Sequence, residues 1–163
     1  MIGEAHQAAV RSAAEFADQI ARMLYFASGA FHAKHPTQSP AKRGAAARFA
    51  RLVLPLLDEL TAVPQPRVTL HLVQTLDHIA AADPKRALLI AASAVTADQA
   101  YWRELAGVHA ALDLVRHIAA DHREIFLGDP QSTTAVRRML ESFIRVGWDQ
   151  AIELASEPDE LFT

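Results

Sequence analysis

The sequence predicts an all-α fold, and three observations carry this prediction. The chain is rich in alanine and has no asparagine, and alanine has the highest helix propensity whereas asparagine favours turns. Apolar residues recur at helical spacing along most of the 163 residues. Aspartate precedes proline at Asp83–Pro84 and Asp129–Pro130, which is the pattern of a helix cap followed by the first helical residue. We therefore expect about seven helices and no strand of useful length.

A long first helix is expected over residues 4–30, because apolar residues repeat there every seven positions. One series is Val10, Ala17, Leu24 and Phe31, and three positions after its first three members come Ala13, Ile20 and Ala27. Phe16, Met23 and Phe26 form a second apolar flank. A helix with two apolar flanks contacts neighbours on two sides. This helix therefore either closes the end of the helical array or pairs with a second copy of the chain in a homodimer.

The whole chain, residues 1–163, is expected to form one domain. After the first helix it contains an exposed connector at 32–43 and a helical core at 44–162. The connector carries two prolines, several basic residues and no acidic residue. Helices are expected over about 45–60, 67–82, 84–95, 98–127 and 130–147, followed by a short last helix. Pro55 should kink the first of these, Asp98 should cap the long one, and Leu161 and Phe162 should pack a tail onto the core.

Composition excludes several classes of protein. The chain has no cysteine, so disulfides, thiolate zinc sites and thiol nucleophiles are ruled out, and a cytoplasmic protein is the default expectation. A formal net charge of −3 argues against a general nucleic-acid or membrane binder. The first residues lack the pattern of a signal peptide, and no apolar window is long enough to span a bilayer. No cofactor-binding motif is present, so we expect no cofactor.

The segment from Phe49 to Ala82 resembles a HEAT or armadillo-type repeat. Its first helix contains a proline (LVLPLLDEL), its turn contains two more (TAVPQPRV), and its second helix ends in LDHIAAADP. The resemblance implies an α-solenoid fragment, in which helix pairs stack and leave an extended surface for partners. An irregular antiparallel helical bundle is the alternative architecture, because no second copy of the proline-containing helix is found.

A longer stretch, Pro64 to Phe162, resembles the helical C-terminal tails of large bacterial ATP-binding proteins, some of which belong to defence systems. The resemblance rests on the order of PQPRVTLHLVQTLDHIAAADP, a long helix ending in HREIF, then FIRVGWDQAIEL and a terminal DELF. It implies a part of a larger bacterial assembly. It carries over no catalytic residue, since the nucleotide-binding part of such proteins would precede this stretch.

These features favour a non-catalytic protein–protein interaction or scaffolding module over an enzyme. No Gly-rich phosphate loop, nucleophile elbow or zinc-protease motif is present. The residues expected to contact a partner are a polar row on the helix of residues 67–82 and two aromatic residues near the start of the long helix: His71, Gln74, His78, Tyr101 and Trp102.

Two alternatives rest on other side chains. His109, Asp113 and His117 are spaced four apart, so they share one side of a helix, and they are candidate ligands of a divalent metal in a helical-bundle enzyme or metal-binding protein. The same spacing is also that of ordinary side-chain pairs that stabilise a solvent-exposed helix face, without any metal. Arg48 and Arg51 near the connector, and Arg137 and Arg138 on the helix of residues 130–147, are two candidate basic patches for nucleic acid, although they lack interleaved aromatic residues.

Overall fold

The structure, a computed structural model, describes residues 2–32 and 39–156, with side chains from residue 7 onward. Within these ranges the protein is all-α, as expected, with eight α-helices and no strand. The helices are α1 (Ile2–Ser28), α2 (Pro40–Leu60), α3 (Pro66–Ile79), α4 (Pro84–Ala97), α5 (Leu105–Asp121), α6 (Glu124–Gly128), α7 (Pro130–Arg145) and α8 (Asp149–Ser156). None of the described helices is long and apolar enough to cross a membrane.

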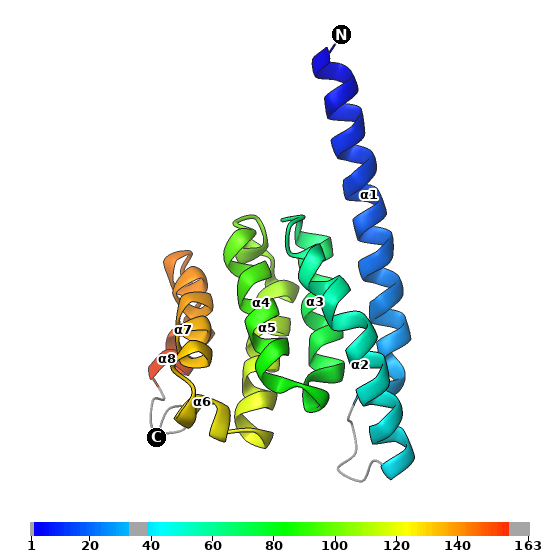
Figure 1. Ribbon diagram of the computed structural model, residues 1–163. Helices are drawn as coiled ribbons and strands as arrows, with labels where there is room; N and C mark the ends of the chain where they lie inside the picture. The colour runs from blue at the N-terminus through cyan, green and yellow to red at the C-terminus, as the bar shows by residue number, and fades with distance from the viewer. Residues whose placement is uncertain (1, 33–38, 157–163) are drawn as a thin grey trace.

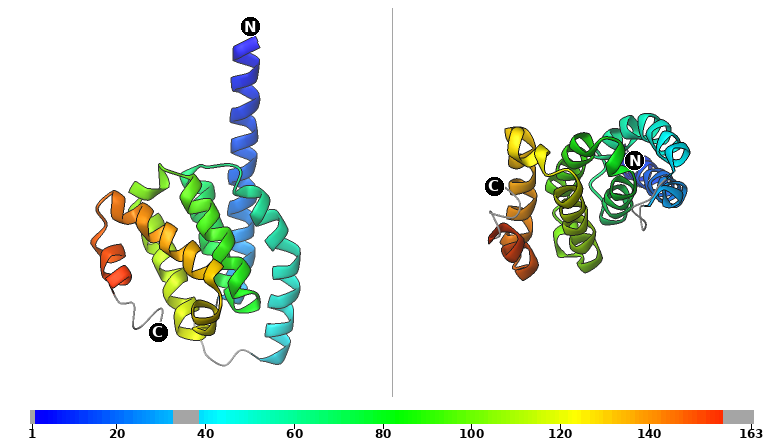
Figure 2. Two further views of the ribbon diagram at one scale, coloured as in Figure 1. Left: turned by 60° about the vertical axis from the view of Figure 1, so that its left-hand side comes forward. Right: turned by 90° about the horizontal axis from the view of Figure 1, so that it is seen from below.

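The helices are arranged in two layers (Figures 1 and 2). One layer contains α1, α3 and α5, which pack side by side in that order, and the other contains α2, α4 and α7. Helix α3 packs against both α2 and α4, and α4 packs against α5, so these contacts join the layers. The most extensive contacts join α1 with α3, α3 with α5 and α4 with α7, so within each layer a helix packs on one that is not its immediate neighbour in sequence.

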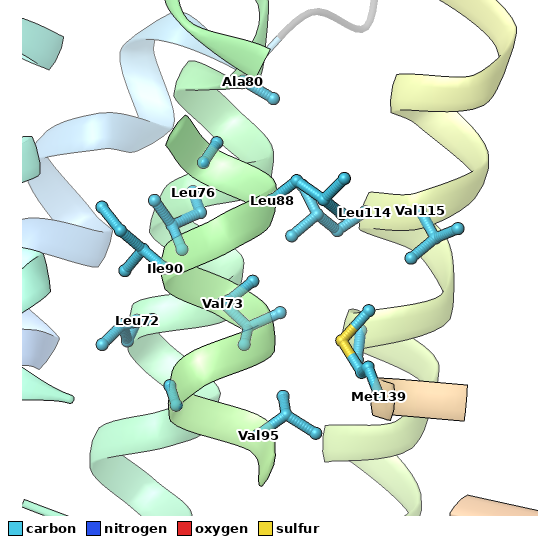
Figure 3. Close-up of a cluster of buried hydrophobic side chains, with 14 of the residues drawn as sticks. Leu72, Val73, Leu76, Ala80, Leu88, Ile90, Val95, Leu114, Val115 and Met139 are labelled. Atoms are coloured by element: carbon cyan, nitrogen blue, oxygen red, sulfur yellow. The ribbon is translucent and has the colours of Figure 1, made fainter. Parts of the chain in front are cut away.

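A continuous hydrophobic core lies between the layers (Figure 3). Its central side chains are fully buried and come from α3, α4, α5 and α7: Leu72, Val73, Leu76, Leu88, Leu114, Val115 and Met139. Burying one such side chain contributes roughly 1.5–3 kcal/mol. The apolar spacing that predicted these helices therefore also gives the main stabilising term of the fold.

Capping residues set several helix ends as the sequence predicted. Asp83 accepts a hydrogen bond from the amide of Arg86 at 3.1 Å, and Asp129 accepts one from the amide of Ser132 at 3.1 Å. Each satisfies an amide group that has no partner within its own helix. Gly147 follows the end of α7 with φ of +91°, a conformation that glycine adopts without steric cost.

The helix expected over residues 98–127 is a misassignment, because the structure divides this range into the 3₁₀ turn η3 (Tyr101–Arg103), α5 and α6. Asp98 is 2% exposed, and its carboxylate accepts hydrogen bonds from the Thr69 hydroxyl at 2.7 Å and the Tyr101 amide at 3.1 Å. It thus holds η3 against α3. Gly107 of α5 lies against the Tyr101 ring, where a β-carbon would approach to 2.6 Å.

The region around the predicted connector also differs. Helix α2 begins at Pro40, inside the range 32–43, and Ser39 caps it by accepting a hydrogen bond from the amide of Lys42 at 3.3 Å. A serine cap followed by proline is a helix start that the basic, proline-containing composition concealed. Helix α2 continues through Pro55 without a break. Residues 33–38 and the tail residues Leu161 and Phe162 lie outside the described residues.

Candidate functional site

A groove runs along the solvent side of α3 and α5, and it consists of two hollows of about 520 and 330 Å³ that share Ala106. The larger hollow lies at the N-terminal ends of the two helices and is lined by Gln65, Pro66, Arg67, Leu70, Glu104, Ala106 and Gly107. The smaller hollow is lined by Tyr25, His32, Gln74, Asp77, His78, Ala106, His109, Ala110 and Asp113. The groove thus follows α3 and α5, and its smaller hollow also reaches the end of α1.

Helical spacing explains how these side chains reach one surface. On α3, Leu70, Gln74 and His78 stand four residues apart, and on α5 Ala106, Ala110 and Asp113 follow the same face. The small side chains of Ala106 and Ala110 leave room between the two helices. The packing of α3 on α5 then turns two separate polar rows into the two walls of one groove.

Two carboxylates define the electrostatics of the smaller hollow. Asp77 contacts Nδ1 of His117 at 2.8 Å, and its side chain is only 13% exposed. Asp113 pairs with Arg116 at 3.4 Å, and its side chain is 55% exposed. The side chains that line this hollow include no lysine or arginine, so it presents net negative charge when its histidines are neutral.

The end of α1 forms the third wall. The Tyr25 ring stacks on His71 and on His78, with ring centroids 5.6 and 5.4 Å apart. The Ser28 hydroxyl lies 2.8 Å from Nδ1 of His78, and the His32 ring meets His78 edge-on at 4.6 Å. Histidine rings therefore serve as packing surface where α1 meets α3.

Two histidines where α1 meets α3, His71 and His78, have pKa values that favour the neutral imidazole. Burial is the main cause that lowers the pKa of His71, with Arg22 and Arg67 acting in the same direction and Asp18 opposing. Burial also lowers the pKa of His78, helped by His32 and opposed by Asp77. Both imidazoles are therefore uncharged at neutral pH, which leaves Asp77 and Asp113 to dominate the charge of the groove.

The residues expected to contact a partner divide into two groups. Gln74 and His78 line the groove, and His71 lies beside it against Tyr25. The expectation that Trp102 is an exposed anchor is wrong, because Tyr101 and Trp102 are 0% and 8% exposed. Trp102 donates from Nε1 to the carbonyl oxygen of Val95 at 2.6 Å, so its polar atom is satisfied inside the fold.

The candidate metal ligands are distributed over the same surface. His109 and Asp113 line the groove, whereas His117 is paired with Asp77 of α3. Over residues 2–32 and 39–156, no three histidine, aspartate or glutamate side chains are grouped so that they could hold one metal ion. The geometry of the described residues therefore fits pairwise hydrogen bonding in the groove.

The candidate basic patches lie on two different helices. Arg48 and Arg51 are exposed on α2, and Arg137 and Arg138 are exposed on α7. Helix α4 lies between α2 and α7 (Figure 1). The four arginines therefore make two separate pairs.

Sequence reasoning missed Tyr25, His32 and Asp77 as groove residues. Tyr25 and Ser28 stand three positions apart at the end of α1, so helical register could have placed them on one side of it, whereas His32 follows the 3₁₀ turn Gly29–Phe31. Asp77 stands next to His78 and would have extended the polar row on α3. Nothing local in the sequence shows that this side of α1 meets α3.

Comparison of the chain with models of known protein families, with curated proteins and with solved structures found no match.

Proposed function

We propose that this chain is a non-catalytic protein-interaction module that binds an extended segment of a partner protein in the α3–α5 groove. The observation that carries the proposal is the continuity of the two hollows at Ala106. In this proposal the two helix layers are a HEAT-like scaffold, and the module serves a larger assembly, as the resemblance to helical tails of bacterial ATP-binding proteins implies.

The dimensions of the groove favour a peptide segment. From Pro66 to His78 the groove follows α3 for about 18 Å, at a rise of about 1.5 Å per residue. About five residues of extended chain span that length. The larger hollow offers apolar surface at Pro66 and Leu70. The smaller hollow offers Gln74 and the histidines as hydrogen-bonding groups.

The charge of the smaller hollow favours a basic side chain of the partner. Asp77 and Asp113 face this hollow without a lining lysine or arginine, and Tyr25 adds an aromatic ring beside them. A lysine or arginine side chain of the partner would gain charge-assisted hydrogen bonds there. Each carboxylate already has one partner, in His117 or Arg116, so the incoming cation would join an existing network rather than neutralise an isolated charge.

A positional-scanning library of short peptides tests the proposal without knowledge of the partner. Selection of lysine or arginine at one position is expected, and binding should weaken as salt rises. Asp77→Asn with Asp113→Asn should remove the preference for lysine or arginine. Ala106→Trp should abolish binding, because the indole would fill the space that the two hollows share. The matched control is Ala120→Trp, an exposed position on α5 outside the groove lining. Binding that survives Ala106→Trp, or a library without any basic preference, would refute the proposal.

A further inference from the structure

Helix α1 carries an exposed apolar face that the rest of the described chain leaves uncovered. Phe16, Met23 and Phe26 are 64%, 70% and 66% exposed. The opposite side of α1 contains Ala17 and Ala21, which are 5% and 0% exposed and pack into the core. The two apolar flanks read from the sequence are therefore real, and among residues 2–32 and 39–156 only one of them packs against the rest of the protein.

The N-terminal part of α1 extends beyond the two layers (Figures 1 and 2). Every described side chain from residue 7 to residue 13 is exposed, including Val10 at 54%. A helical segment of this length is marginal in water when nothing packs against it. A partner that covers the apolar face would supply the missing stabilisation.

The sizes of the outward side chains differ between the two halves of α1. Ala9, Ser12, Phe16, Gln19, Met23 and Phe26 follow each other at alternating steps of three and four residues, which is the spacing of a coiled-coil seam. The two positions at the N-terminal end of this seam, Ala9 and Ser12, are small, and the two at its C-terminal end, Met23 and Phe26, are large. Parallel self-pairing would place large against large and leave a gap at the small end, whereas antiparallel pairing matches large with small.

We propose that α1 pairs antiparallel with α1 of a second copy of this chain, about a two-fold axis near residues 17 and 18. This register places Phe26 opposite Ala9, Met23 opposite Ser12 and Phe16 opposite Gln19. The N-terminal part of α1 in each copy, which extends beyond the two layers, then lies along the C-terminal part of α1 in the other copy, which packs on the layers. The pairing is independent of the groove and of the function proposed for it.

The charges along the seam favour the same register. Glu15 and Arg22 are both exposed on the same side of the seam, and the antiparallel arrangement brings Glu15 of each copy near Arg22 of the other. Parallel pairing would place Glu15 opposite Ile20 and Arg22 opposite Ala27, so it would form no such charge pair. The Arg22 guanidinium already lies over the Phe26 ring, 5.7 Å from its centroid, so it flanks the apolar contact.

The area available is of the order that a dimer needs. Phenylalanine buries roughly 150–250 Å² when fully covered, and the exposed fractions of Phe16 and Phe26 mean that four rings in two copies would contribute on the order of 500 Å². Met23, Val10 and the alanines add to this total. Specific interfaces bury about 1,200–2,000 Å², so we expect a dimer that dissociates on dilution.

Analytical ultracentrifugation of the full chain over a range of concentrations tests the proposal. The wild type should change from monomer to dimer, and Phe16→Glu with Met23→Glu should be monomeric at every concentration. Glu15→Arg and Arg22→Glu should each weaken the dimer about tenfold, and the double charge exchange should restore it. Leu52→Glu is the matched control, since Leu52 is 78% exposed on α2 and lies outside the seam.

Single cysteines distinguish the register, because the natural chain has none. Across the antiparallel axis two copies of Gln19→Cys lie about 5 Å apart along the helix, whereas two copies of Ala9→Cys lie about 25 Å apart. A short thiol cross-linker should therefore join only the former. A wild-type monomer at all concentrations, a dimer that survives Phe16→Glu with Met23→Glu, or efficient Ala9→Cys cross-linking would overturn the proposal. Protection of α3 and α4 amides in hydrogen exchange would show that the variants remain folded.

Discussion

Helix α3 is held from two directions by very different surfaces. Toward α4 it presents side chains such as Leu72 and Leu76, which are 0% exposed and lie beside Ile90 (Figure 3). Toward α1 it meets small residues such as Ala21, together with an array of polar rings in which Tyr25 lies against His71 and His78. One interface is dry and aliphatic, and the other is mixed and titratable.

The difference indicates how rigidly each part of the molecule is fixed. Aliphatic burial depends little on pH and contributes most of the stability. The α1–α3 interface relies more on small-residue contacts, on a hydrogen bond between Ser28 and His78, and on imidazoles that must stay neutral. Helix α1, which forms one wall of the groove, is therefore expected to open before the other helices do.

The largest effect is expected from Leu76→Ala in the aliphatic interface. Leu76 is 0% exposed, and removing its isopropyl end from a packed core should lower the free energy of unfolding by about 2–5 kcal/mol. Urea denaturation followed by circular dichroism measures this change. Leu52→Ala, at a side chain 78% exposed on α2, is the control and should stay within about 0.5 kcal/mol of wild type. Equal losses for the two variants would contradict the assigned core.

Gly107→Ala should have the next largest effect. The added β-carbon would lie 2.6 Å from Cε2 and 2.8 Å from Cζ of Tyr101, a ring that is 0% exposed and cannot move outward. Overpacking of this kind costs about 1–3 kcal/mol, which outweighs or offsets the gain of about 1 kcal/mol in helix propensity. Gly128→Ala is the control, since its β-carbon would meet no atom within 4 Å. A Gly107→Ala protein more stable than the Gly128→Ala protein would show that the ring has room.

Local signals in the sequence were sufficient for the parts of the fold that local chemistry decides. The Asp83 and Asp129 caps were predictable, because each carboxylate accepts a hydrogen bond from an amide group three residues away. Asp98 followed the same pattern but misled the prediction. Its carboxylate binds the hydroxyl of Thr69, which is 29 residues distant in sequence, and no local pattern reveals that partner.

The candidate site was predictable only in pieces. The polar rows containing His78 on α3 and His109 on α5 were recognised separately, and their meeting in one groove depends on how the helices pack. Trp102 was expected outside, because an aromatic pair near a helix start resembles an interface anchor. Its indole instead fills the space behind η3 and donates to Val95, an arrangement that only the tertiary structure specifies.

A smaller effect, confined to the mixed interface, is expected from Ser28→Ala. The Ser28 hydroxyl donates to the carbonyl oxygen of Tyr25 at 2.8 Å. The hydroxyl oxygen of Ser28 also lies 2.8 Å from Nδ1 of His78. Losing this hydroxyl should cost about 1 kcal/mol and should raise amide exchange in residues 17–28 of α1 more than in α4. Ser93→Ala, at an exposed position on α4, should change neither. Uniform loss of protection across both helices would contradict the distinction between the two interfaces.

The smallest effect is a pH dependence limited to the docking of α1. Burial holds the pKa of His71 and His78 below the ordinary value of 6.5, so a proton binds more tightly to the undocked state than to the docked state. The stabilisation is therefore complete above about pH 6.5 and is lost as the pH falls from there toward the pKa of the docked state. Asp18, Asp77, Arg22, Arg67 and His32 face these rings, and the carboxylates reduce the shift without reversing it.

Hydrogen exchange at about pH 7.5 and about pH 5.5, corrected for the intrinsic rates, measures this dependence over the range where histidine titrates. Residues 17–28 of α1 should lose protection at the lower pH, while α4 should keep it. His71→Gln with His78→Gln should exchange equally at the two pH values, because neutral side chains of similar size replace both titrating rings. If this double variant retained the full pH dependence, the titrating group would lie elsewhere, and the contrast between the two faces of α3 would have to be assigned to packing alone.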